Sequence, residues 1–88
     1  MKKYLKWDAD AWDDYLYWQK TDKKTMKRVN DLIKDIMRDP FHGIGKPEGL
    51  KGNLSGLWSR RIDGEHRIVY LVEYDSILIF SCRGHYNI

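Results

Sequence analysis

Cysteine and long apolar runs are the scarcest features of this 88-residue chain. Its one cysteine, Cys82, excludes an internal disulfide and leaves no CxxC pair for a structural metal site. The longest apolar run has five residues, Ile68 to Val72, so the sequence shows neither a membrane-spanning segment nor a signal-peptide core. Because free thiols persist in reducing compartments, we expect a cytoplasmic protein.

The chain is also too short for a second hydrophobic core, and we expect residues 1–88 to form a single domain. Positive charge is plentiful, since sixteen basic residues against thirteen acidic ones give a net charge of +3. This excess suits an anionic partner without identifying one. The basic residues from residue 45 onward are Lys46, Lys51, Arg60, Arg61, Arg67 and Arg83. Five of them lie in the stretch from Gly45 to Tyr70 and Arg83 lies in the segment from Cys82 to Tyr86, and we expect these two segments to form the functional site.

The first half of the chain predicts a short edge strand at residues 3–7, followed by two helices. The first helix runs from a capping aspartate, Asp8 or Asp10, to about Gln19. Apolar side chains recur on one of its faces at helical spacing, and we expect this face to lie in the core. These side chains are Trp12, Tyr15 and Leu16. The opposite side of the helix carries Tyr17 and Trp18.

The second helix is predicted from Lys23 to about Arg38, with a polar cap at Thr21 or Asp22. Its apolar residues follow a helical period, and charged residues occupy its other side. The predicted core residues are Met26, Val29, Ile33 and Ile36. Residues 40–56 contain both prolines and five of the seven glycines, which indicates a long loop, with or without a short extended piece.

Three strands follow, at residues 57–62, 66–73 and 77–82, with a hairpin turn at Asp63-Gly64. We therefore predict an α+β fold, with two N-terminal helices packed on one face of a small, mainly antiparallel β-sheet. The hairpin register stays open. A two-residue turn places Arg60 opposite Arg67, whereas one bulged residue places Arg61 there. Simple alternation on the last strand assigns one face to Ile79, Ser81, Arg83 and His85.

Cleavage of RNA through its own 2'-hydroxyl needs a base for the hydroxyl proton, cations for the phosphorane, and an acid for the departing 5'-oxygen. The second half of the chain contains a candidate for each role. Glu48 lies in the loop between cations, Arg67 lies on a strand, and His85 lies near the C-terminus. We expect no metal or other cofactor, because this half lacks a carboxylate cluster for a metal ion.

Other reactive side chains receive structural interpretations. Cys82 ends an apolar strand, and we expect it to be a packed thiol instead of a nucleophile. His66 follows the hairpin turn, and we expect it to support that turn. His42, in the loop, has no assigned role.

Six motifs, in this order, make the chain similar to a known family. They are WDDYLYW from Trp12, NDLIKDI from Asn30, GKPEGLK from Gly45, LSGLWSRRI from Leu54, EHRIVY from Glu65 and CRGHY from Cys82. The sequence resembles the Txe/YoeB family of bacterial toxin endoribonucleases, in the RelE-like superfamily. The resemblance implies a RelE-like microbial RNase fold and a ribosome-dependent mRNA interferase that cleaves mRNA in the ribosomal A site.

The same resemblance implies partners and residue roles. It implies a YefM-type antitoxin that inhibits the toxin and, together with it, binds operator DNA and represses the operon; a homodimer is a further expectation. Glu48 is the implied general base, Arg67 the transition-state arginine and His85 the general acid. The RNA-binding residues implied by the resemblance are Lys51, Arg61 and Tyr86. Lys46, a cation beside Glu48 in the sequence, is a further RNA-binding candidate. The chain departs from the family pattern at Gly49, at Gly84 and in its last two residues, Asn87 and Ile88.

Two alternatives stay open on the sequence. One is a non-catalytic toxin on the same scaffold, such as a gyrase inhibitor. The other is an RNA-binding module whose basic face holds phosphates without cleaving the chain. Cleaved mRNA ends would distinguish the enzyme from both.

Overall fold

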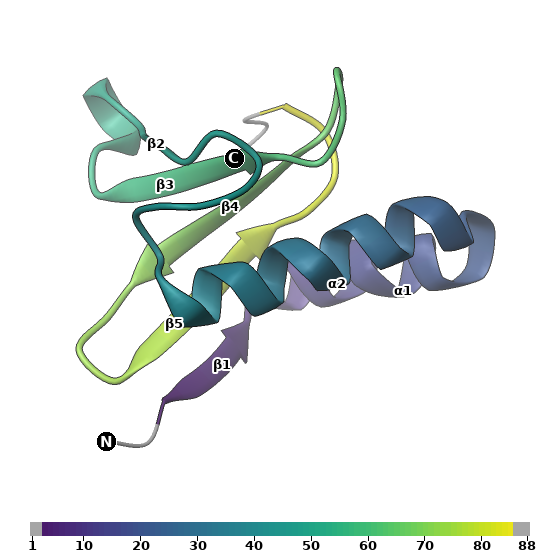
Figure 1. The fold of residues 1–88 in the computed structure, drawn as a ribbon, viewed down its shortest axis with the longest axis horizontal. Coiled ribbons are helices and arrows are strands. Elements are labelled where there is room, and N and C mark those ends of the chain that lie inside the picture. The colour runs from purple at the N-terminus through teal and green to yellow at the C-terminus, as the bar shows by residue number, and fades with distance from the viewer. Residues whose placement is uncertain (1–2, 86–88) are drawn as a thin grey trace.

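The computed structural model describes residues 3–85, which form a five-stranded sheet and two α-helices (Figure 1). The elements in chain order are β1 (Tyr4–Trp7), α1 (Ala9–Thr21), α2 (Lys23–Arg38), β2 (Glu48–Gly49), a 3-10 turn (Gly52–Leu54), β3 (Leu57–Arg61), β4 (Arg67–Val72) and β5 (Ser76–Ser81). The predicted helices, strands and edge strand are confirmed. The predicted long loop contains the short strand β2.

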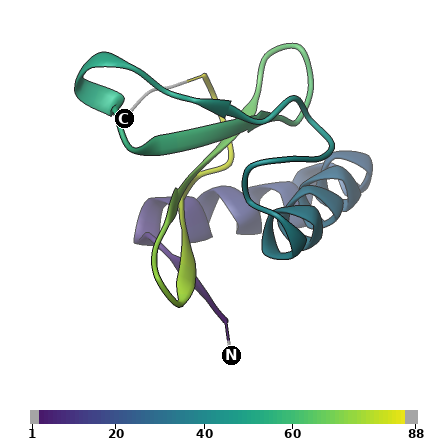
Figure 2. The ribbon, with the colours of Figure 1, turned by 60° about the vertical axis from the view of Figure 1, so that its left-hand side comes forward.

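The strands lie in the order β1-β5-β4-β3-β2. β1 pairs with β5 in parallel, and the three other neighbouring pairs are antiparallel. Both helices lie against the same face of this mixed sheet, as Figures 1 and 2 show. The predicted α+β architecture is therefore confirmed, and the opposite face of the sheet is left without a helix. This second face is called the open face below.

Most of the core side chains that come from the two helices belong to α2. Asp22 caps it, since its carboxylate accepts hydrogen bonds from the backbone N–H and the hydroxyl of Thr25. Of its predicted core residues, Val29, Ile33 and Ile36 are buried, and Met26 is partly buried and packs against the core. They pack with the apolar side chains that β4 and β5 direct toward the helices, which are Ile68, Tyr70, Ile77 and Ile79.

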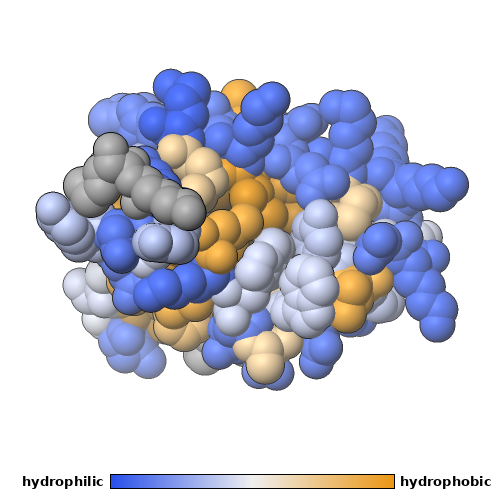
Figure 3. Space-filling view, turned by 90° about the horizontal axis from the view of Figure 1, so that it is seen from below, coloured by the Kyte–Doolittle hydropathy of each residue, from blue (hydrophilic) through white to orange (hydrophobic). Residues whose placement is uncertain are grey.

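The predicted core face of α1 is wrong for two of its three residues. Trp12 is 44% exposed and Leu16 is 41% exposed, whereas Tyr15 is partly buried and packs against the core. Ala11 and Trp18 are the buried residues of this helix. The physical reason is close packing: a small alanine lets the helix approach β5, and Trp18 donates from Nε1 to the carbonyl oxygen of Cys82 at 2.7 Å. Figure 3, which views the molecule from below relative to Figure 1, shows an area of hydrophobic residues surrounded by hydrophilic ones.

The turn between β3 and β4 resolves the open register. The backbone N–H groups of Ile62 and Asp63 both donate to the carbonyl oxygen of His66, at 3.0 and 3.4 Å, so the turn has one residue more than Asp63-Gly64. Asp63 Oδ1 stabilises it by accepting from the backbone N–H groups of Glu65 and His66. As a result Arg61, and not Arg60, lies opposite Arg67.

A bulge in β5 overturns the simple alternation expected there. Val69 pairs with Ser81 whereas Tyr70 pairs with Ile79, so Phe80 is an extra residue. Ile79 therefore faces the helices with Tyr70, and Ser81 faces the open side with Val69. The inserted residue therefore puts Ile79 and Ser81 on opposite faces of the sheet, where simple alternation predicts the same face.

Neither helix among the described residues is long and apolar enough to cross a membrane.

Candidate active site

The strand register gathers three charged candidates on the open face. Glu48 in β2 lies opposite Ser59, and Ser59 shares its face with Arg61, two residues later in β3. Arg61 in turn lies opposite Arg67 at the start of β4. Neighbouring strands are about 4.8 Å apart, so these three strands place a carboxylate and two guanidinium groups on one small surface.

Arg67 is held by the turn that precedes it. Its Nη1 donates to the carbonyl oxygen of Asp63 at 2.8 Å and to that of His66 at 3.1 Å. Both bonds engage the same nitrogen of the planar guanidinium fork. The half-buried side chain therefore has a defined orientation at the end of a rigid strand.

The segment after β5 returns to β4 and brings His85 to the same surface. The backbone N–H of Arg67 donates to the carbonyl oxygen of Gly84 at 2.9 Å. The backbone N–H of Gly84 donates to Nδ1 of His66, also at 2.9 Å. His85 follows directly and is exposed. The structure thus brings the predicted acid, His85, next to the strand end that carries Arg67.

The start of this segment is fixed to α1. The backbone N–H of Cys82 donates to Asp14 Oδ2 at 3.1 Å, and the Cys82 carbonyl accepts from Trp18 as described above. Burial raises the pKa of Asp14, and the hydrogen bond from Cys82 partly opposes this shift. Burial also raises the pKa of the Cys82 thiol to about 12. A thiol with so high a pKa stays protonated near neutral pH, which agrees with a packed, unreactive Cys82.

The remaining predicted cations divide into two groups. Lys46 and Lys51 are exposed on either side of Glu48. Lys46 has a left-handed backbone, with φ of 53°, where the chain turns into β2. Arg60 is fully buried on the helix side of the sheet, and Arg83 lies over the ring of Tyr17 on α1, 3.7 Å from its centroid. Tyr86 lies outside the described residues.

A surface cavity of about 660 Å³ lies near the open face, and its lining does not include Glu48, Arg61 or Arg67. Its lining includes Asp8, Asp10, Asp14 and Glu65, together with His66, Ser81, Arg83 and other residues of this region. So many carboxylates repel phosphate groups. A phosphate-bearing ligand therefore suits the cationic open face better than this cavity.

Several residues that position the site were missed or placed wrongly by sequence reasoning. Trp18 was assigned to the wrong side of α1, and nothing in the local pattern of Asp14 indicated a bond to Cys82. His66 was expected to support the hairpin; it also accepts from Gly84, and its ring packs edge-on against Trp18 with centroids 4.9 Å apart. The only local signal for these contacts was their presence in the matched motifs.

Comparison with known proteins gives a consistent result over most of the chain. The family described as the YoeB-like toxin of bacterial type II toxin-antitoxin systems matches residues 7–86. Toxin YoeB of Escherichia coli strain K12 is 63% identical over 82 residues, which are 93% of this chain and 98% of that protein. Toxin RelK of Mycobacterium tuberculosis is 54% identical over 82 residues, which are 93% of this chain and 96% of that protein.

Solved structures agree with the sequence relatives. A YoeB/ParE toxin from Agrobacterium tumefaciens has a TM-score of 0.89 and 48% identity, covering 98% of this chain and 100% of that chain. A YoeB-YefM complex from Staphylococcus aureus contains a chain with a TM-score of 0.87 and 46% identity, covering 98% of this chain and 100% of that chain. The protein therefore belongs to the YoeB-like toxins of bacterial type II toxin-antitoxin systems.

Proposed function

We propose that this toxin is an endoribonuclease, a ribosome-dependent mRNA interferase that cleaves mRNA in the ribosomal A site. The observation that carries the proposal is the open face itself. The register of β2, β3 and β4 places Glu48 and Arg67 on one surface, and the Gly84 bonds bring His85 beside them. These are the residue types that RNA cleavage through the 2'-hydroxyl requires.

Each side chain has one role in this proposal. Glu48 takes the proton of the 2'-hydroxyl as its oxygen attacks the adjacent phosphorus. Arg67 donates to the phosphorane oxygens as their negative charge grows. His85 gives a proton to the 5'-oxygen as the P–O5' bond breaks. The products are a 2',3'-cyclic phosphate and a 5'-hydroxyl.

Additional cations extend the same surface. We assign Arg61, Lys46 and Lys51 to the RNA phosphates, since Arg61 is exposed opposite Arg67 and both lysines are exposed near Glu48. Tyr86 is assigned to a base by the resemblance alone. In this mechanism the cations supply the charge stabilisation that a metal ion supplies in other nucleases, and the reaction is metal-independent.

The partners of the toxin are part of the proposal. A YefM-type antitoxin is supported by the YoeB-YefM complex from Staphylococcus aureus, and a homodimer by the YoeB dimer from that organism. We infer that the antitoxin covers or distorts the surface around Glu48 and His85, and that operator DNA is bound only through the toxin-antitoxin complex. A complex structure that leaves this surface open and undistorted would contradict the first inference.

Primer extension in a translating system tests the activity. The purified toxin is added to translating ribosomes, with a matched reaction that lacks ribosomes, and new mRNA ends are mapped and their terminal groups identified. We expect cuts inside the A-site codon only when ribosomes are present, and none with Glu48→Ala or His85→Ala. Unchanged cleavage by these two variants would exclude the assigned mechanism, and no cuts by the unmodified toxin would exclude the activity.

A further inference from the structure

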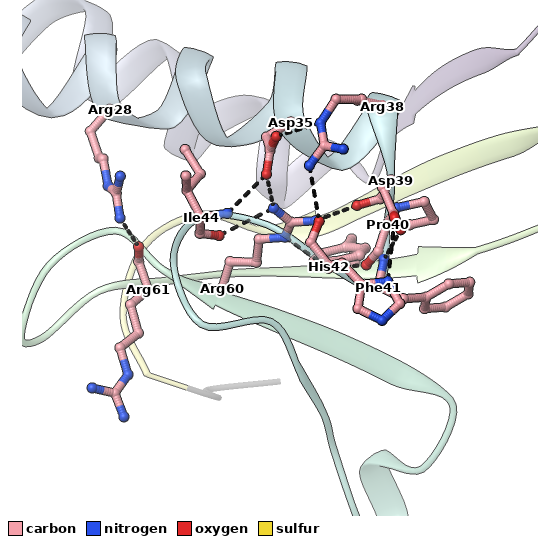
Figure 4. A network of polar contacts seen from close by, with 11 residues as sticks. Arg28, Asp35, Arg38, Asp39, Pro40, Phe41, His42, Ile44, Arg60 and Arg61 are labelled. Carbon is pink, nitrogen blue, oxygen red and sulfur yellow. Dashed lines mark hydrogen bonds and ion pairs between the residues drawn. The ribbon is translucent and has the colours of Figure 1, made fainter.

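Arg60 is the largest fully buried side chain on the helix side of the sheet, and all five of its N–H groups donate hydrogen bonds (Figure 4). Nε donates to the hydroxyl of Tyr70. Nη1 donates to Asp35 Oδ2 and to the carbonyl oxygen of Ile44. Nη2 donates to the carbonyl oxygens of Asp39 and His42. Three of the five acceptors are therefore backbone carbonyls of one loop, residues 39–44.

The neighbours of Arg60 hold the same loop. The Tyr70 hydroxyl donates to the carbonyl oxygen of Pro40 at 2.6 Å, and the backbone N–H of Ile44 donates to Asp35 Oδ2 at 2.9 Å. A side chain at Gly43 has no room, because a Cβ there would lie 1.9 Å from Asp35 Oδ2. The loop is thus packed directly on the Arg60–Asp35 ion pair.

Hydrophobic packing contributes less to the placement of this loop. Phe41 packs edge-on against Trp58, with ring centroids 5.0 Å apart, but Phe41 and Ile44 are still 43% and 44% exposed. Burial of apolar area is the usual force that fixes a segment, and here much of that area stays in water. The hydrogen bonds to Arg60 and its partners are therefore the main contacts that define the path of the backbone.

The loop leads directly to the proposed general base. Gly45 follows Ile44, and its carbonyl oxygen accepts from the backbone N–H of Arg61 at 2.7 Å. Only Lys46 and Pro47 separate this bond from Glu48, and the pyrrolidine ring of Pro47 fixes one of the intervening φ angles. A shift of the loop therefore passes to Glu48 through a short and stiff connection.

We propose that Arg60 is a positioning residue for Glu48. From the helix side of the sheet, Arg60 holds the loop of residues 39–44. The held loop orients Glu48 toward the scissile phosphate on the open face. The proposal rests on the proposed function, in which Glu48 is the base. Arg60 itself does not touch RNA. A lysine has the same charge but only three N–H groups on a single nitrogen, so it leaves acceptors of the loop unpaired.

Single-turnover cleavage on programmed ribosomes tests this role with Arg60→Lys. We expect the rate constant at saturating ribosome to fall at least tenfold, while the ribosome concentration for half-maximal rate changes less than twofold. The matched control is Val29→Ala, a core change on α2 away from the loop. We expect this control to lower the midpoint of thermal unfolding and to leave the cleavage rate unchanged at a temperature where the protein is folded. If both variants lose rate in proportion to their lost stability, the positioning role is wrong.

A double variant shows whether the loss is transmitted through Glu48. Glu48→Asp moves the carboxylate by one methylene, and in this background Arg60→Lys should lower the single-turnover rate constant threefold or less. In a Lys51→Ala background, Arg60→Lys should again lower this rate constant at least tenfold. Equal losses in the two backgrounds would contradict transmission through the base.

Amide hydrogen exchange separates this inference from the proposed activity. Arg60→Lys should increase exchange at Ile44, whose N–H bonds to Asp35, and leave the core amides of β4 protected. If the unmodified toxin cleaves nothing, the proposed function fails while faster exchange at Ile44 still supports the loop-holding role. Unchanged exchange at Ile44 would overturn that role whatever the activity.

Discussion

Arg60 and Arg61 are neighbours on β3, yet their environments are opposite. Arg60 points toward α2, is fully buried and donates five hydrogen bonds, whereas Arg61 points away from α2 and is exposed opposite Arg67 (Figure 4). The cause is the two-residue period of a strand, which sends successive side chains to opposite faces of the sheet. The same residue type therefore holds the structure on one face and presents an exposed charge on the other.

The two faces of the sheet differ in the same way. On the helix side, each buried polar side-chain atom among the described residues has a hydrogen-bond partner. The open face instead displays exposed or half-buried charge, at Glu48, Arg61 and Arg67. We infer that substitutions on the helix side change mainly stability and loop position, whereas substitutions on the open face change mainly the reaction.

The largest expected effect comes from removing the buried cation. Arg60→Met should lower the free energy of unfolding by about 3 kcal/mol or more, because Asp35 and the loop carbonyls lose their partner in the interior. Arg61→Met, one residue away, should change it by less than about 0.5 kcal/mol. Urea unfolding followed by tryptophan fluorescence measures both. Similar losses for the two variants would refute the contrast between the faces.

On the open face, removal of Arg67 should change the reaction and not the fold. We expect Arg67→Ala to raise the activation free energy by about 3 kcal/mol, which is a loss of roughly a hundredfold in single-turnover rate. The control is Arg83→Ala, because Arg83 lies against Tyr17 on α1. A near-unchanged rate in Arg67→Ala would exclude its role at the phosphorane.

A smaller effect should appear in the dependence of stability on pH. The hydrogen bond from Arg38, the backbone N–H of Ile44 and Arg60 together hold the pKa of Asp35 well below its usual value. A depressed folded-state pKa stabilises the protein above the unfolded pKa, about 4, and this stabilisation is lost progressively as the pH falls below it. Asp35→Asn should therefore be less stable than the unmodified toxin at pH 7, and the difference should narrow toward pH 3.

Urea unfolding between pH 7 and pH 3 measures the Asp35 effect. The control is Asp31→Asn, since Asp31 forms an exposed ion pair with Lys27 that contributes little. A stability difference for Asp35→Asn that stays constant with pH would show that ionisation of Asp35 is not its source.

The smallest effect distinguishes two tryptophans of α1. Trp18→Phe removes the indole N–H that bonds to Cys82 in the interior and should cost about 1 kcal/mol of unfolding free energy. Trp12→Phe keeps an aromatic ring at a half-exposed position and should cost less than about 0.5 kcal/mol. Urea unfolding of both variants provides the comparison. A larger loss of unfolding free energy for Trp12→Phe than for Trp18→Phe would support the core face of α1 that was expected from the sequence.

The buried face could be predicted from the sequence for α2 but not for α1. In α2 the apolar residues and the charged residues separate cleanly around the helix, so its buried face followed from spacing alone. In α1 aromatic residues occur on several sides, and which of them is buried depends on Ala11 fitting close to β5. Close packing of this kind involves residues that are far apart in the chain. The spacing of apolar residues along one helix does not reveal such contacts.

In the candidate site, too, the sequence predicted one part and only the structure shows the other. Glu48, Arg67 and His85 were selected from the sequence because general acid-base cleavage needs those side chains and because they stand in motifs shared with a known family. Their assignment stays a proposal, and the structure adds the strand register and the Gly84 bonds that bring them to one face. No sequence signal indicated that Arg60 was buried, because the hairpin register was open by one residue.

Local chemistry alone determined the elements of this protein. Its signals are capping aspartates, prolines and glycines in the loop, and alternating strands with a turn between them. These preferences act over a few residues and can be read in order along the chain. Tertiary structure decided the extra residue in the β3–β4 turn, the bulge at Phe80, and the partners of Arg60. Each of these changes a side chain's face or its burial, and a one-residue difference is settled only by packing and hydrogen bonding across the whole sheet.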